Sequence, residues 1–230
     1  MIAEQILTRS EEDYVKAIYN LTLEGEPAST LRIATSLSVA PASVTNMLQK
    51  LAEAQPQLVL YQKHRGVLLT EAGRLAAMRI IRRHRLIETF LYEVMGYSWE
   101  QVHAEAEVLE HVISPYFEER LAIILSEPIL DPHGEPIPNR NGEIAANDGA
   151  VQLSQVQAGQ RAEISRVISN DQALLAYICQ SGLQPGIAVN VLTRNPLDGT
   201  LQVALNDSDQ GNQVLGEKIA GAIWVLVKLH

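Results

Sequence analysis

The chain has 230 residues, 47% of them hydrophobic and 20% charged, which fits two globular domains or one domain with an appendage. No apolar run approaches the ~18 residues of a membrane span, and the start lacks a basic-then-apolar signal pattern, so we expect a cytoplasmic protein with no membrane partner. A single cysteine, Cys179, excludes an internal disulfide framework and agrees with that compartment.

The net charge of −9 argues at first against a nucleic-acid partner. The charge is unevenly distributed, however. Residues 32–85 contain nine Lys or Arg and two acidic residues, a net of +7 that leaves −16 for the rest. A locally basic segment in an acidic chain can be an electrostatic footprint for phosphate, or simply a solvated helix face. Charge alone leaves both interpretations open.

The amino-terminal part predicts three helices. Ser10 resembles a helix start, because Ser-Glu-Glu-Asp has the form of a capping box, and Gly25 and Pro27 end that helix. A short helix over residues 31–37 follows. After a tight turn, Pro41 suits the first position of the next helix. Two short helices joined by a tight turn are typical of a helix-turn-helix.

Two β-rich runs, residues 58–61 and 67–70, flank a polar turn and predict a hairpin that would form a wing. Helix-turn-helix pairs also occur as plain packing motifs, but the basic wing favours DNA binding. Small, hydroxyl and amide side chains suit a major groove, where they meet phosphates, adenine edges and thymine methyl groups. The residues expected at the DNA are Arg32, Pro41, Ala42, Ser43, Thr45, Asn46, Gln49, Lys50, Lys63, His64 and Arg65.

A mainly helical region follows the predicted wing. We expect a long helix over residues 71–95 that stops at Gly96, a second from a capping box at Ser98 to about residue 113, and a third over 115–125. The last helix carries more apolar residues than one side of a small domain needs, which suggests a dimer surface.

The next segment, DPHGEPIPNRNGEIAANDG, is rich in proline and glycine and predicts a linker. Four short strand-like runs and one helix, about 171–181, come after it and indicate a small β-barrel; the runs are residues 162–168, 188–193, 200–204 and 221–229. The fold class is therefore mainly α with β. The expected domains are a winged helix-turn-helix at 1–70, a helical metal-binding and dimerisation domain at 71–130, a linker at 131–150, and an SH3-like barrel at 151–230.

Imidazoles and carboxylates recur at helical spacing between residues 84 and 112. At about 100° per residue, His103, Glu107, Glu110 and His111 fall on one side of a helix, at the edge of an apolar stripe. Two imidazoles and two carboxylates beside a core carry a heavy desolvation cost unless something compensates them. A divalent cation would compensate all four, so the spacing favours a metal site.

Neighbouring residues of the same types have simpler explanations. His84 and Glu88 share a helix face and fit a plain ion pair. Asp13 fits a capping carboxylate near the start of the first helix, and Glu105 points to solvent on the opposite face.

The order of a winged helix, HRLxExFL, VHxEAExLEHxxS, DPHGxPIP and a small barrel resembles the diphtheria-toxin-repressor family of metal-dependent transcriptional regulators, with an FeoA-like barrel. The resemblance covers essentially the whole chain. It implies a homodimeric repressor that binds a palindromic operator when loaded with Mn(II) or Fe(II), with no small-molecule substrate. It places the main metal site on Asp13, Glu107, Glu110 and His111, and the ancillary site on His84, Glu88 and His103.

The carboxylates Asp13 and Glu107 follow the manganese branch of that family, because the iron branch has methionine and cysteine there. An oxygen-rich site with one imidazole also suits a hard ion. Two departures stand out. Lys16 replaces a second glutamate found in some manganese regulators, and Arg166 and Ser169 fall where iron-type barrels provide ligands; Glu163 or Asp171 could substitute.

Three alternatives remain at this stage. One is an iron-dependent regulator of the same family, which would share the order of the domains. A metal-transport accessory protein would use the FeoA-like barrel at a membrane transporter, and the winged helix argues against it. A carboxylate-rich metalloenzyme would need Glu-x-x-His on two helices, which the sequence does not provide.

Overall fold

The computed structural model describes residues 7–23, 25–144, 149–169, 171–205 and 211–228. The chain forms two compact units. One unit contains the chain up to His84 together with Glu110–Ile113 and Pro138–Glu143; the other contains Arg85–Leu109, Ser114–Ile137 and the chain from Ile144. Among the described helices, none combines the length and apolar character that crossing a bilayer requires.

The first unit begins with α1, Arg9–Leu21, and its start differs from the prediction. Thr8 is the cap, and the capping box is Thr8 with Glu11, since each accepts a hydrogen bond from the backbone of the other. Ser10 therefore lies inside the first turn. The helix ends before Gly25, and the Thr22 hydroxyl donates to Ile18 O at 2.8 Å.

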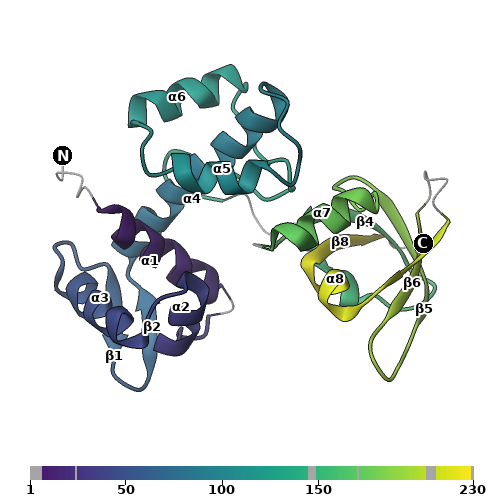
Figure 1. Cartoon of the computed structure of the whole chain (residues 1–230), viewed down its shortest axis with the longest axis horizontal. Coiled ribbons are helices and arrows are strands. Elements are labelled where there is room, and N and C mark those ends of the chain that lie inside the picture. Colours follow the sequence, from purple (N-terminus) through teal and green to yellow (C-terminus); the bar gives the residue numbers. More distant parts are fainter. Residues whose placement is uncertain (1–6, 24, 145–148, 170, 206–210, 229–230) are drawn as a thin grey trace. The chain divides into compact units, whose positions relative to one another are not determined.

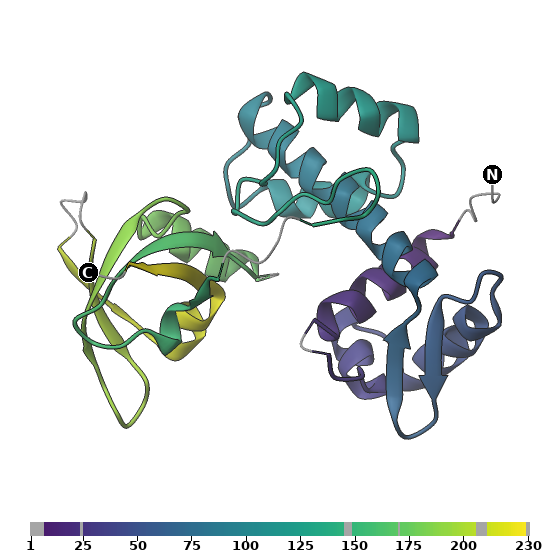
Figure 2. The ribbon, with the colours of Figure 1, turned by 180° about the vertical axis from the view of Figure 1, so that it is seen from behind.

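The helix-turn-helix is confirmed. Helix α2, Thr30–Leu37, ends at Ser38, whose φ of 54° makes the tight turn, and α3, Pro41–Glu53, begins with proline at its first position. Figure 1 and Figure 2 show these helices and α1 around one hairpin. Their shared core is apolar and includes Val15, Ile18, Ile33, Val44, Leu48, Leu51, Val59, Val67 and Ile80.

The hairpin pairs β1, Val59–Gln62, with β2, Gly66–Leu69, in antiparallel register from Val59↔Leu69 to Gln62↔Gly66. The basic residues 63–65 form its turn, as predicted. Gly66 has a φ of +96°, and a Cβ there would lie 2.8 Å from Ala28 O, so this position requires glycine.

The helical region contains α4, Glu71–Glu93, α5, Val102–Leu109, and α6, Pro115–Ile124. Helix α5 is shorter at both ends than the sequence predicts. Residues 98–101 form a turn in which Ser98 N–H donates to the Gln101 side chain at 3.2 Å. At the other end the helix stops at Leu109, and residues 110–112 form a turn.

The proline-rich segment predicted to be a linker is held along its described part by arginines of α4. Arg74 donates to Gly142 O at 3.0 Å and Arg82 to Pro138 O at 2.7 Å, both within the first unit. In the second unit, Arg85 donates to Pro136 O at 2.6 Å. Composition predicts a free linker here because the sequence does not reveal long-range donors to its carbonyl groups.

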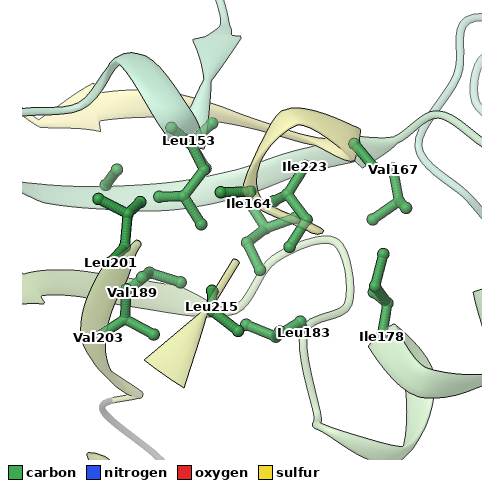
Figure 3. Packing of buried hydrophobic residues seen from close by; sticks show 14 of the residues in the cluster. Leu153, Ile164, Val167, Ile178, Leu183, Val189, Leu201, Val203, Leu215 and Ile223 are labelled. Carbon is green, nitrogen blue, oxygen red and sulfur yellow. The ribbon is translucent and has the colours of Figure 1, made fainter. Parts of the chain in front are cut away.

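The carboxyl-terminal part is a six-stranded antiparallel sheet in the order β3-β8-β4-β5-β6-β7. Four strands confirm the predicted runs, whereas β3 and β7 and the short helix α8, Glu217–Ala222, were not predicted. Figure 3 shows the core, where side chains from the sheet and from α7, Gln172–Gln180, converge. The strands are β3, Val151–Gln152; β4, Arg161–Val167; β5, Ala188–Arg194; β6, Leu201–Leu205; β7, Asn212–Leu215; and β8, Ile223–Lys228.

Gly73 provides a test of how α4 packs against the hairpin. A Cβ at Gly73 would lie 2.0 Å from Leu58 O, and backbone cannot move as a flexible side chain does. We expect Gly73→Ala to lower the free energy of unfolding by about 3 kcal/mol, measured by urea denaturation. Gly221→Ala is the control, since a Cβ at Gly221 would meet no atom of the described part of the chain within 4 Å. Equal stability of the two variants would contradict this packing.

Candidate metal centre

In the first unit, Asp13, Glu110 and His111 bring ligand atoms within 4.8 Å of one another. Asp13 comes from α1, and the other two come from the turn after α5. The His111 Nε2 atom lies 3.0 Å from Asp13 Oδ1 and 3.4 Å from Glu110 Oε1. Two carboxylate oxygens and one imidazole nitrogen are a donor set for a hard divalent cation.

The orientation of the His111 ring supports this fit. Its Nδ1 lies 2.6 Å from Glu12 Oε2, so a neutral imidazole donates that N–H to Glu12 and keeps its lone pair on Nε2. The Nε2 atom is buried and makes no hydrogen bond to any residue that the structure describes. A lone pair directed at two carboxylates is repelled unless a cation or a proton lies between them. A carboxylate partner on the second ring nitrogen is also the usual arrangement for a metal-binding histidine.

Sequence reasoning missed Glu12. Its carboxylate also lies 3.5 Å from Arg83 Nη1, and its side chain is 13% exposed. In the sequence Glu12 is one of three successive acids at a helix start, where acidic residues are common for electrostatic reasons alone. The signal in the sequence that could have identified Glu12 is its position next to Asp13, a predicted metal ligand.

Glu110 is fully buried and is surrounded by potential donors. Its oxygens lie 2.9 and 2.8 Å from Lys16 Nζ, and Oε2 lies 2.5 Å from His84 Nδ1. His84 is also buried, and its Nδ1 is 3.3 Å from Lys16 Nζ. An ionised carboxylate without solvent needs such partners.

The second unit contains another group of the predicted residues. His103 Nδ1 lies 3.0 Å from Glu88 Oε1, and its Nε2 lies 3.8 Å from Glu107 Oε1. The prediction placed His103, Glu107, Glu110 and His111 on one continuous helix face, and this was wrong in one respect. Helix α5 ends at Leu109, so Glu110 and His111 follow it in a turn and are not constrained by helical spacing.

Sequence reasoning also missed Asp131 and His133. With Glu88 they form a buried group whose ligand atoms lie within 4.8 Å of one another. His133 Nδ1 is 3.8 Å from Glu88 Oε2, and Asp131 Oδ1 accepts the backbone N–H groups of His133 and Glu135 at 2.8 and 2.9 Å. The motif Asp-Pro-His-Gly has the composition of a turn, which concealed its side chains as candidate ligands.

Both new residues have perturbed pKa values. Burial, together with the negative charge of Glu88, raises the pKa of Asp131 to about 7. Burial works against protonation of His133, but the contact with the Glu88 carboxylate and the negative charges of Glu88 and Asp131 outweigh it and raise the pKa of His133. Two carboxylates and an imidazole in so small a volume are a second set that a divalent cation would stabilise.

The barrel positions suggested as ancillary ligands have other contacts. The Arg166 guanidinium lies 4.9 Å from the centre of the Trp224 ring, and Ser169 accepts the Asp171 N–H at 3.0 Å. The proposed substitutes contact lysines: Glu163 lies 2.6 Å from Lys228 Nζ, and Asp171 lies 2.7 Å from Lys218 Nζ.

The expected DNA-contacting residues lie on one unit. The α3 residues Pro41, Ala42, Ser43, Asn46, Gln49 and Lys50 are exposed, Thr45 is half-buried, and Arg32 is exposed on α2. A shallow hollow is lined by Pro41, Ala42 and Thr45 of α3 and by the wing-tip residues Lys63, His64 and Arg65. Lys50 also contacts Glu11 at 3.2 Å.

The basic segment contributes less to that face than its charge suggests. Arg82 is buried against Pro138 O, Arg83 lies beside Glu12, and Arg85 contacts Glu135 at 2.5 Å and Asp131 at 3.5 Å. Part of the net positive charge of residues 32–85 therefore belongs to side chains that contact other parts of the protein, and only the remainder is available to attract phosphate.

A winged helix-turn-helix joined to helices that gather carboxylates and imidazoles defines the class: a DNA-binding protein that responds to a metal. Comparison with known proteins supports this class domain by domain. Residues 6–67 match the iron dependent repressor N-terminal DNA binding domain, 70–139 the iron dependent repressor metal binding and dimerisation domain, and 151–227 the FeoA domain.

The iron-dependent repressor IdeR of Mycobacterium tuberculosis is 32% identical over 198 residues, covering 81% of this chain and 85% of its own. The regulator MntR of Geobacillus kaustophilus is 42% identical over 107 residues, 46% of this chain and 74% of its own. A solved manganese-dependent transcriptional repressor in complex with manganese has a TM-score of 0.85 at 36% identity, covering 94% of this chain and 99% of that one.

The chain belongs to the iron-dependent repressor family, which includes the diphtheria toxin repressor and the MntR regulators. It is a metal-dependent transcriptional repressor with a DNA-binding domain and a dimerisation domain. The family consists of DNA-binding repressors and not of enzymes, which sets aside the metalloenzyme alternative.

The buried group around Asp131 predicts a pH-dependent stability. Because the folded-state pKa of Asp131, about 7, exceeds its ordinary value of 3.8, the folded chain binds more protons between these limits. Stability therefore falls as pH rises through this range, and the raised pKa of His133 acts in the same direction. With EDTA present, we expect the urea midpoint to be lower at about pH 8 than at about pH 5.

Asp131→Asn should reduce that pH dependence, by an amount on the order of a few kcal/mol between the two conditions. Asp198→Asn, at a carboxylate whose pKa is lowered by the Thr200 N–H, is the matched surface control. The same pH dependence in Asp131→Asn as in the unaltered chain would contradict the assignment.

Proposed function

We propose that this repressor responds to Mn(II), binds a palindromic operator as a homodimer in the cytoplasm, and controls metal-uptake genes. The observation that carries the proposal concerns the buried Nε2 of His111, which is directed at Asp13 and Glu110 and has no hydrogen bond among the described residues. Fe(II) is the alternative, because a relative bearing the name iron-dependent repressor matches over most of the chain.

Ligand chemistry supports manganese. The group around His111 offers oxygen atoms and one imidazole, and the lone Cys179 lies on α7, away from these residues in the sequence. Hard oxygen donors suit Mn(II), and a site without thiolate gives no preference to a soft ion. The solved repressor described above is manganese-dependent and is a complex with manganese, in agreement with this choice.

We assign the main site to Asp13, Glu110 and His111 of the first unit. Glu107, which the family resemblance implies as a further ligand, belongs to the second unit. We assign the ancillary site to Glu88 and His103, with His84 one turn earlier on α4. The buried Asp131 and His133 join Glu88 as additional candidates, since Glu88 contacts both histidines. A divalent ion at either site would neutralise clustered carboxylates.

The residues themselves explain how loading would affect DNA binding. Asp13 lies on α1, which shares its core with α2 and α3, whereas Glu110 and His111 lie in the turn after α5. Holding these segments together fixes α1, and with it the recognition helix α3. In a dimer, two such helices must meet the DNA about one helical turn, ~34 Å, apart.

The dimer surface is assigned to α6 and its continuation. Tyr116, Phe117, Ile123 and Ile124 are exposed there, and Ile129 is 74% exposed. Large apolar side chains gathered on one helix are typical of a protein interface. This agrees with the matched dimerisation domain, which covers residues 70–139.

Variants at His111 and Glu12 test the main site. We expect His111→Ala to abolish Mn(II)-dependent operator binding, measured by fluorescence anisotropy with labelled duplex. Glu12→Gln leaves the ligands in place but weakens the partner of Nδ1, so Mn(II) affinity should fall about 10- to 100-fold. Glu105→Ala, at an exposed carboxylate of α5, is the control. Unchanged metal-dependent DNA binding in His111→Ala would refute the assignment.

The wing and the recognition helix should affect DNA binding differently. Arg65→Ala, at the wing tip, removes a phosphate contact, so binding should weaken about equally for operator and unrelated DNA and the salt slope should fall by about one. Gln49→Ala, exposed on α3, should cost about 1–3 kcal/mol on the operator alone. Loss of operator preference in Arg65→Ala with none in Gln49→Ala would contradict these roles.

A further inference from the structure

The ammonium group of Lys16 lies among atoms that resemble a cation site. Its Nζ is 2.8 and 2.9 Å from the two Glu110 oxygens and 3.3 Å from His84 Nδ1. The Lys16 side chain is 14% exposed, and that of Glu110 is fully buried. Lys16 follows Asp13 by three residues on α1, so the same helix carries both a metal-ligand candidate and this positive charge.

The contacts of Lys16 and Glu110 place conflicting requirements on the protonation of His84 Nδ1. An ammonium has donors only, so its contact with His84 requires the Nδ1 lone pair, whereas the 2.5 Å contact of the same Nδ1 with Glu110 Oε2 requires an N–H. One atom cannot satisfy both at once. Such a set of two oxygens and a nitrogen is stabilised by positive charge at its centre, and Lys16 supplies it in the absence of metal.

Resting on the function proposed above, we propose that Lys16 is a tethered cation that competes with the divalent ion for Glu110. In the metal-free chain Lys16 neutralises Glu110 and keeps its oxygens engaged. Metal loading requires at least one of those oxygens to leave the ammonium. Lys16 therefore sets the metal concentration at which the repressor loads, and its own positive charge disfavours a second divalent ion beside the first.

Competition and an ordinary structural ion pair predict different effects on metal affinity when the Lys16 charge is removed. Removing the Lys16 charge leaves a buried carboxylate uncompensated, so the metal-free chain becomes less stable. The same carboxylate is then available to the metal, so metal affinity rises. Coupling between linked binding events typically changes an affinity by about 5- to 150-fold, which sets the scale expected here. A purely structural lysine would lower stability without raising affinity.

The experiment compares the full chain with Lys16→Met and Lys16→Arg. Mn(II) affinity is measured from the electron paramagnetic resonance signal of free Mn(II), and the melting temperature is measured in EDTA. We expect Lys16→Met to bind Mn(II) about tenfold more tightly or better. Its melting temperature in EDTA should fall by several degrees. The control is Arg194→Met, which removes an exposed positive charge at the end of β5 and should change neither the Mn(II) affinity nor the melting temperature in EDTA.

Equal or weaker Mn(II) affinity in Lys16→Met would overturn the proposal. If that variant folds only when Mn(II) is present, the proposal is supported. If it folds in neither condition, Lys16→Arg decides. A guanidinium binds both oxygens of a carboxylate, so Lys16→Arg should weaken Mn(II) binding. Unchanged Mn(II) affinity in Lys16→Arg overturns the proposal. His111→Ala separates the two hypotheses: if it binds Mn(II) as the unaltered chain does, the proposed site itself is wrong.

Discussion

The burial of the Glu110 carboxylate is the constraint on which the first unit depends. A negative charge removed from water must be matched by positive charge or by hydrogen-bond donors. Here the partners come from α1 through Lys16 and from α4 through His84, with His111 adjacent in the chain. The contacts of this one carboxylate therefore join α1, α4 and the turn after α5. Of these, α1 also shares its core with the recognition helix α3.

The second unit solves a similar problem around Glu88. This buried carboxylate has His103 Nδ1 at 3.0 Å and His133 Nδ1 at 3.8 Å, and Arg85 reaches Asp131 nearby. Each unit thus places imidazoles beside an acid that solvent cannot reach. Protons and protein cations stabilise such groups incompletely, as the raised pKa of Asp131 indicates. In the proposed sites, a divalent ion would complete this compensation.

Much of this architecture could be predicted from the sequence, because hydrophobic period and turn residues are local signals. The helix-turn-helix, the wing and four barrel strands follow from them. Local signals failed where long-range contacts determine the structure. They predicted that α5 continues past Leu109, and they did not reveal the arginines that bind the proline-rich segment. They also could not give the orientation of the His111 ring, because its partner Glu12 is 99 residues away in the chain. Asp131 and His133 were not predicted as candidate ligands, because their motif Asp-Pro-His-Gly is also explained by a turn.

The basic segment shows why charge in a sequence is not charge on a surface. Arg82 and Arg85 bind carbonyl groups of the proline-rich segment, and Arg83 lies beside Glu12, so these positive charges serve folding. The predicted DNA face retains a small number of basic side chains in a chain of net charge −9. Non-specific attraction to phosphate is then weak, and affinity must come from correctly placing both recognition helices. A repressor built in this way has a physical reason to depend on whatever fixes α1: without bulk charge to hold it on DNA, geometry decides whether it binds.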